Sequence, residues 1–153
     1  MKKILCYLAI LALVCAVPVK RADVGKLRPI QTVQVSRKGD LVTLRTDTKD
    51  MGSGSTVRQA LENLKATTPG VVYLDTAEFL ILSKNTLDCV EELREVLHGN
   101  VKLCIAEETI QPAEVTQYLS SHEILPKLKN WQQEMPLPVL IQLGERLLLK
   151  NDQ

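Results

Sequence analysis

The sequence STVRQALENLKATTPG, residues 55–70, decides the fold because it carries the clearest amphipathic pattern of the chain. Its apolar side chains recur at i, i+3, i+4 and i+7, which places them on one stripe of an α-helix. They are Val57, Ala60, Leu61 and Leu64. Thr56 and Gln59 have the spacing of a capping box, and Thr68-Pro69-Gly70 supplies a stop signal. We therefore predict a helix that begins after Thr56 and buries one face.

Upstream of this helix, two segments alternate apolar and polar residues, as half-buried strands do. They run over 30–35 and 41–48, and the polar stretch Arg37-Lys38-Gly39-Asp40 separates them. This pattern predicts a β-hairpin. Between the hairpin and the helix, the glycine-serine stretch 51–56 breaks the alternation. We predict a flexible turn there, capped by Thr56.

Downstream of the helix, short apolar runs and amphipathic stretches follow one another. We predict strands at 71–74, 78–82 and 101–106, and a closing hairpin within 138–149. We predict helices over 87–97, from Pro112 onward, and over 124–131. A mixed sheet with helices packed on one or both faces is the economical arrangement of this order. The predicted fold class is therefore α/β (α+β), with residues 30–153 in one domain.

The chain opens with Met1-Lys2-Lys3 and an apolar run at 4–19. This run is too short to cross a bilayer comfortably and is typical of a signal-peptide helix. Small residues permit a cut after Ala16, so we interpret 1–16 as a signal peptide that is either cleaved there or kept as an uncleaved anchor. In a second interpretation, Cys15 becomes the lipid-carrying residue of a lipoprotein, although Val14 departs from the Gly, Ala or Ser usual before that cysteine. Both interpretations predict an exported protein.

Residues 17–29 form a predicted basic connector between this leader and the domain. Its cations are Lys20, Arg21, Lys26 and Arg28. Such a cluster either contacts the anionic head groups of a membrane surface or stays solvated beside the signal peptide.

The composition and motifs argue against nucleic-acid binding, a metal site and catalysis, and they indicate no particular function. The chain has 153 residues, 45% of them hydrophobic and 24% charged, as in an ordinary globular protein. A formal net charge of +1 and an aromatic content of 3% give no basic footprint and no stacking platform for nucleic acid. No Cys/His pair has metal-ligand spacing, and no serine lies in a nucleophile elbow. We expect no enzyme, no metal site and no cofactor.

Three further groups of residues are candidates for chemistry or cross-linking. Glu107-Glu108 follows a predicted strand, where catalytic acids occur in α/β proteins, but a charged strand end is the commoner explanation. His98 and His122 are placed at a helix end and a helix start. Export permits a disulfide between Cys89 and Cys104. Because both lie among apolar residues, we favour two buried free thiols.

One local pattern resembles a ligand cradle. Glycines before a helix let backbone N–H groups approach an anion at the positive helix end. The residues concerned are Gly52, Ser53, Gly54, Ser55 and Thr56. They are the candidate site of one possible function, a secreted module that binds a small ligand or a cell-wall component. The chain lacks the lysine of a nucleotide-binding P-loop.

A longer pattern links these features. From Thr46 to Ser83 the order is a hairpin end, the glycine-serine stretch, the Thr-x-x-x-Ala-Leu-x-x-Leu helix, the turn Thr68-Pro69-Gly70 and the strand Phe79-Leu80-Ile81-Leu82. This order resembles the N-terminal domain of the Ger(x)C spore germination lipoproteins, the C subunits of germinant receptors in endospore-forming bacteria. Met135-Pro136-Leu137-Pro138 is similar to the point where that domain ends.

This resemblance implies a non-enzymatic, exported and membrane-associated protein that acts through protein–protein contact. Its expected partners are the membrane subunits of a germinant receptor. Its expected location is the outer face of the cytoplasmic membrane, which in a spore is the inner membrane. No residue-level binding site is transferred by the resemblance.

Overall fold

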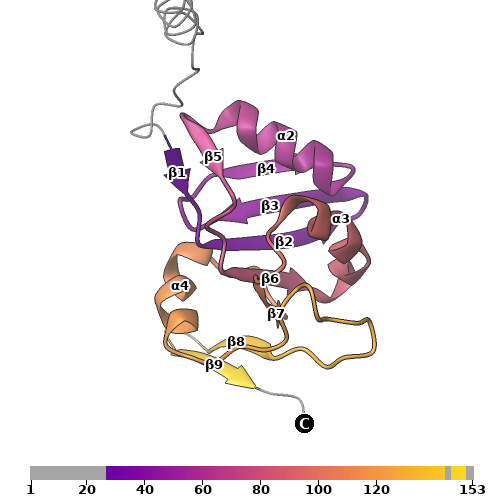
Figure 1. The fold of residues 1–153 in the computed structure, drawn as a ribbon, viewed down its shortest axis with the longest axis vertical. Helices are drawn as coiled ribbons and strands as arrows, with labels where there is room; N and C mark the ends of the chain where they lie inside the picture. The colour runs from indigo at the N-terminus through magenta and orange to yellow at the C-terminus, as the bar shows by residue number, and fades with distance from the viewer. Residues whose placement is uncertain (1–26, 144–145, 151–153) are drawn as a thin grey trace, which may run out of the picture.

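Seven strands hydrogen-bond in the order β4-β3-β2-β6-β7-β8-β9 in the computed structural model, which describes residues 27–143 and 146–150 (Figure 1). Four neighbouring strands are parallel: β2 (Thr32–Lys38), β6 (Phe79–Ser83), β7 (Lys102–Ala106) and β8 (Val139–Leu143). Antiparallel strands extend both ends: β3 (Leu41–Thr46), β4 (Met51–Gly54) and β9 (Arg146–Lys150). The predicted mixed sheet and single α+β domain are confirmed. The predicted signal-peptide helix, the cut after Ala16 and lipidated Cys15 lie outside the described residues.

Both predicted hairpins are confirmed. In the first, Lys38 pairs with Leu41 across a tight turn, where Gly39 has a φ of 60°. That left-handed conformation suits glycine because it has no Cβ. The second hairpin joins β8 to β9, with Ile141 opposite Leu148.

A second, two-stranded sheet lies beside the first. It pairs β1 (Leu27–Pro29) in parallel with β5 (Val71–Tyr73). The strand predicted at 71–74 is thus confirmed, although it pairs outside the main sheet. The predicted connector at 17–29 is wrong at its end, because residues 27–29 are a strand of the fold.

A capping residue and a proline mark the starts of two of the helices. In α2 (Val57–Thr67), the Gln59 N–H donates to Thr56 Oγ1 at 3.2 Å, and the four predicted apolar residues are buried. The 3₁₀ helix η2 (Lys84–Cys89) leads into α3 (Val90–Val96), so the helix predicted over 87–97 is one short α-helix preceded by a 3₁₀ helix. Helix α4 (Pro112–Ser120) has proline in its first turn, as predicted.

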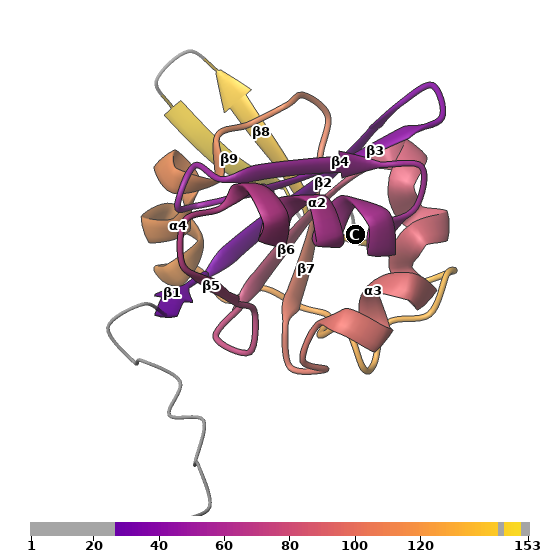
Figure 2. The same ribbon diagram turned by 90° about the horizontal axis from the view of Figure 1, so that it is seen from above.

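The main sheet separates two hydrophobic cores. On one side, Leu64 of α2 and Leu93 of α3 pack in one core with Leu80 of β6. On the other side α4 covers Phe79 and Leu140. Figure 2, which looks onto α2, shows α4 and the β8–β9 hairpin on one flank and α3 on the other.

The helix predicted over 124–131 is wrong. This segment consists of turns and extended backbone, with Lys127 bridged to Lys102 at the start of β7. Pro126 disfavours helical backbone at the residue before it. Ile124 packs in the core under α4, whereas Leu128 and Trp131 pack in the core under α3. The segment therefore passes from one face of the sheet to the other instead of burying one helical stripe.

Candidate functional site

The glycine-serine stretch forms an edge strand. Gly52 and Gly54 lie in β4, opposite Leu44 and Val42 of β3. A Cβ atom on Gly52 would lie 2.3 Å from the Ala60 carbonyl oxygen, and one on Gly54 would lie 2.6 Å from the Ala60 nitrogen. The prediction of a flexible turn over Gly52, Ser53 and Gly54 is wrong. These glycines let α2 pack directly on the backbone of β4.

The positive end of α2 already holds a carboxylate. The Val57 N–H donates to Glu92 Oε2 at 3.0 Å, and the Ser55 N–H and hydroxyl both donate to Gln59 Oε1. A hollow of about 390 Å³ beside this helix end is lined by Glu92 and Glu95. Arg58 also lines the hollow and pairs with Glu95 at 3.1 Å, while the Glu92 carboxylate already accepts the Val57 N–H that an anionic ligand would need. The five candidate residues thus divide into strand Gly52–Gly54 and cap Ser55–Thr56, both serving the fold.

A more open candidate site lies at the carboxyl ends of the parallel strands. Glu107 and Glu108 follow β7 and line a crevice of about 370 Å³ with Arg37 and Lys84. After β6 the chain turns to the α3 side, and after β7 it turns to the α4 side. In open α/β sheets, ligands bind outside the strand ends at such a switch point. The sequence predicts that the glutamates follow a strand, but no local pattern predicts that the two cations lie beside them.

Most charges of this crevice are paired. Lys84 Nζ lies 3.0 Å from Glu107 Oε1, and Arg37 Nη1 lies 2.7 Å from Asp88 Oδ2. The hydrogen bond to Asp88 raises the pKa of Arg37. Glu108 has no ion-pair partner within the described part of the chain. Among the described residues, the crevice thus combines two ion pairs with the Glu108 carboxylate outside them, which leaves one net negative charge.

The loop after β7 is held to the sheet by a buried amide. Gln34 of β2 is only 1% exposed. With its amide oriented to satisfy both groups, Gln34 donates to the Ile110 carbonyl and accepts from the Ile110 N–H. Thr116 of α4 similarly donates to Thr32 Oγ1 at 2.8 Å. These contacts fix the floor of the crevice and the position of α4.

Both described cysteines are free and buried, as predicted. Cys89 and Cys104 belong to the cores on opposite sides of the sheet. Burial raises the pKa of Cys89, against the Arg37 guanidinium that donates to its sulfur at 2.9 Å. Burial raises the pKa of Cys104 to about 12. Neither thiol therefore has the low pKa and exposure of a reactive cysteine.

The histidines make local contacts. His98 accepts from the Asn100 N–H after α3. His122 follows the end of α4, where its ring lies 4.2 Å from that of Tyr118, so its predicted place at a helix start is wrong. In residues 27–143 and 146–150, no three His, Cys, Asp or Glu side chains gather as a metal site.

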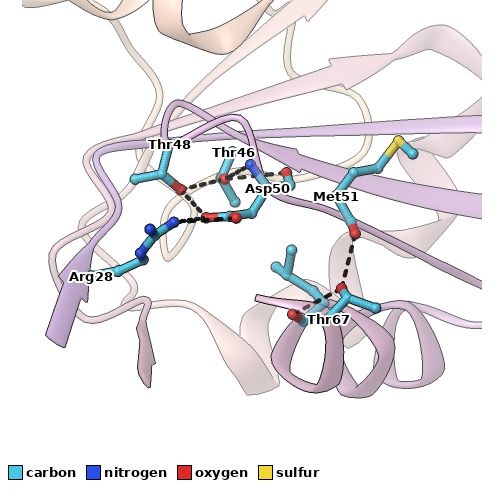
Figure 3. A network of polar contacts seen from close by, with 7 residues as sticks. Arg28, Thr46, Thr48, Asp50, Met51 and Thr67 are labelled. Atoms are coloured by element: carbon cyan, nitrogen blue, oxygen red, sulfur yellow. Dashed lines mark hydrogen bonds and ion pairs between the residues drawn. The ribbon is translucent and has the colours of Figure 1, made fainter. Parts of the chain in front are cut away.

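A polar network holds β1 to the body of the domain (Figure 3). Arg28 Nη1 lies 3.2 Å from Asp50 Oδ2, and Thr48 Oγ1 donates to the same carboxylate at 2.6 Å. Thr46 Oγ1 accepts from the Asp50 N–H. Arg28, predicted as a connector cation that contacts lipid or stays solvated, is thus ion-paired within the fold.

Comparison with family models, curated proteins and solved structures finds no match to the chain. None of the helices in the described ranges has the length and hydropathy of a membrane span. Function is therefore inferred from the residues and their arrangement.

Proposed function

We propose that this chain is a non-enzymatic, exported domain that acts through protein–protein contact at a membrane surface. Its partners would be the membrane subunits of a germinant receptor, as in the Ger(x)C proteins that it resembles. Catalysis, a cofactor and nucleic acid have no part in this proposal.

The proposal rests on the residues that make the chain resemble the Ger(x)C domain, because the structure gives each of them a defined place in the fold. Thr56 caps α2, and Ala60, Leu61 and Leu64 bury it against β4 and the core. The glycines of β4 are needed for that contact. The pattern from 46 to 83 thus contains the consecutive elements β4, α2, β5 and β6, and its glycines and helix residues pack directly on one another.

The attachment of strand β1 supports the same proposal. The apolar run ends at residue 19, and the first strand begins at Leu27. Arg28 then ties this strand to Asp50, and the Ile30 N–H donates to Thr76 Oγ1 at 3.1 Å. A tether in the leader would therefore act on a strand that is fixed to the domain.

The test is deletion of the gene in the bacterium that encodes the chain. We expect spores of the deletion strain to release dipicolinic acid more slowly after a nutrient germinant is added. The full chain should restore release, and a chain that starts at residue 20 should not. Unchanged release, or a bacterium that forms no spores, would refute the proposal.

The crevice at the strand ends favours a second candidate function, binding of a small polar ligand. It replaces the glycine-serine stretch as the site for that function, because Ser36, Glu108 and Thr109 line it away from the core. A ligand that binds there should lose affinity in Glu108→Gln and keep it in Glu95→Gln. Equal affinity in both variants would eliminate the crevice as the site.

A further inference from the structure

An apolar part of the main sheet has no helix over it. Leu140, Leu147 and Leu149 pack in the core under α4. The alternate residues of β8 and β9 therefore point to the opposite face, the one that α2 and α3 cover elsewhere. They include Val139, Ile141, Leu143 and Leu148, and Leu143 and Leu148 are 60% and 50% exposed. We call this surface the β8–β9 face.

A groove runs along the β8–β9 face. It has a volume of about 340 Å³ and lies between β7–β9, Leu87 of η2 and the segment 131–137. Trp131, Met135 and Leu137 line one wall, and Ile105, Val139 and Ile141 line the sheet side. Helix α4 lies between β7 and β8 in the chain and packs on the other face of the sheet. The crossover helix expected at this place in a parallel sheet is therefore not supplied by α4.

The surface suits a helix better than an added strand. The Leu149 N–H donates to Tyr118 Oη at 3.0 Å, so the outer edge of β9 is already partly bonded to α4. An apolar sheet face is covered in most folds by a helix with an apolar stripe. Five-residue strands are about 17 Å long, which matches about three turns of helix.

Charge defines the partner further. Arg146 and Lys150 lie on the same face as Leu148, one on each side of it along β9. Neither cation has an acidic partner among the described residues. At the far side of the groove, Lys84 is paired with Glu107. An apolar surface with two cations on its outer strand, neither of them paired within the described residues, is complementary to an apolar stripe flanked by carboxylates.

We propose that the β8–β9 face binds an amphipathic helix of a second protein, with acidic residues flanking the apolar stripe of that helix. The inference rests on the proposed role in protein–protein contact and names the surface and the chemistry of the partner. The apolar stripe would fill the groove against Trp131 and Ile141, and the acidic flank would pair with Arg146 and Lys150.

The experiment places a photo-reactive benzoylphenylalanine at position 148 of the full chain in the cells that produce it. Leu41, which is 49% exposed on the distant β2–β3 hairpin, is the matched control position. After irradiation, the cross-linked peptides are sequenced by mass spectrometry. We expect an adduct at position 148, and none at 41, with a segment of another protein whose apolar residues recur every three or four positions beside Asp or Glu.

A charge-reversal pair checks the acidic flank. Arg146→Glu with Lys150→Glu should reduce the adduct at position 148 at least tenfold. Lys38→Glu with Lys65→Glu makes the same change of net charge elsewhere and should leave the adduct unchanged. Circular dichroism of each variant verifies that it is folded, as expected for substitutions at exposed positions.

Several results would overturn the inference. They are an adduct only with lipid, only with a second copy of the chain, only with residues 1–26 of the same chain, or no adduct specific to position 148. An adduct that both charge-reversal pairs affect equally would also contradict it. These failures are distinguishable from failure of the proposed function. A helix adduct combined with normal germination would refute the germination role alone, and a germination defect without the adduct would refute the docking surface alone.

Discussion

Gly52 is the residue at which strand and helix approach each other most closely. A Cβ atom there would lie 2.4 Å from the Leu64 nitrogen and 2.3 Å from the Ala60 carbonyl oxygen. Both contacts are with backbone, which cannot rotate away as a side chain can. The cost of any side chain is therefore a displacement of α2 as a whole.

We expect Gly52→Ala to lower the free energy of unfolding by about 2–3 kcal/mol, because the new methyl group overpacks the α2–β4 contact. Urea denaturation measures the change. Ser53→Ala, on the opposite face of the same strand, loses one hydrogen bond to Thr43 and should cost about 1 kcal/mol or less. Equal losses in the two variants would contradict the close packing of α2 on Gly52.

Cys104 gives the stability of the domain a dependence on alkaline pH. Its pKa is about 12 in the fold against an ordinary 9.0, so the unfolded chain loses this thiol proton first. Stability therefore falls as pH rises above about 9, by at most about 1.4 kcal/mol per pH unit from this group. Below that pH, the thiol is protonated in both states and contributes no pH dependence.

The measurement compares the wild type with Cys104→Ala by urea denaturation between pH 8 and pH 10. The difference in unfolding free energy between them should be constant up to about pH 9 and then shrink by up to about 1.4 kcal/mol per unit. The comparison cancels the titration of lysine and tyrosine side chains, which both proteins share. A difference that stays constant to pH 10 would show that Cys104 is not desolvated.

At the scale of elements, side chains from helices close both edges of the main sheet. Asn63 and Thr67 of α2 donate to the carbonyl oxygens of Ser53 and Met51 in β4. Tyr118 of α4 accepts from the Leu149 N–H in β9. Exposed edges otherwise invite pairing with other chains, so these bonds protect the domain from association through its edges.

We expect Tyr118→Phe to accelerate hydrogen exchange of the Leu149 amide about tenfold, because the ring stays but its hydrogen bond is lost. The Leu148 amide, which the strand alternation turns toward β8, should keep its rate and serves as the control within the same molecule. Exchange measured by NMR reports both sites. Equal acceleration at the two amides would indicate that β9 has come loose as a whole.

The sequence predicted correctly those elements whose cap and apolar stripe lie within their own residues. Helix α2 was predictable because its capping residue and its apolar stripe both lie within residues 56–64. Strand β4 was not, since Gly52 and Gly54 have low strand propensity and only the approach of α2 explains them. The apolar residues of segment 124–131 have a helical spacing, which predicts a helix, but they pack in two different cores.

The candidate sites also depend on contacts between distant segments, which local sequence patterns do not predict. Glu107 and Glu108 were visible after a predicted strand, and the register of β2, β6 and β7 then brings Arg37 and Lys84 to the same edge. No spacing in the sequence reveals that neighbourhood, since these strands are far apart in the chain. The role of Glu92 at the start of α2 was hidden for the same reason, because it comes from α3.

At the scale of the whole molecule, the described chain is a sheet with two cores and one incompletely covered face. Most groups that offered chemistry in the sequence are engaged within the fold: the glycines contact α2, the helix end binds Glu92, and the thiols are buried, whereas Glu108 makes no ion pair within the described residues. The apolar β8–β9 face remains as an exposed surface. This face is the surface on which the proposed protein–protein contact depends.

Fractionation of the producing cells tests the central proposal, an exported domain at a membrane surface, most directly. The protein is followed by immunoblotting through cytoplasmic, membrane and external fractions, and mass spectrometry reads its N-terminus. The proposal predicts recovery in the membrane fraction, accessible to protease from outside, with the N-terminus cut after Ala16, lipidated at Cys15 or retained as an anchor. Recovery in the cytoplasm with residues 1–16 intact would contradict it.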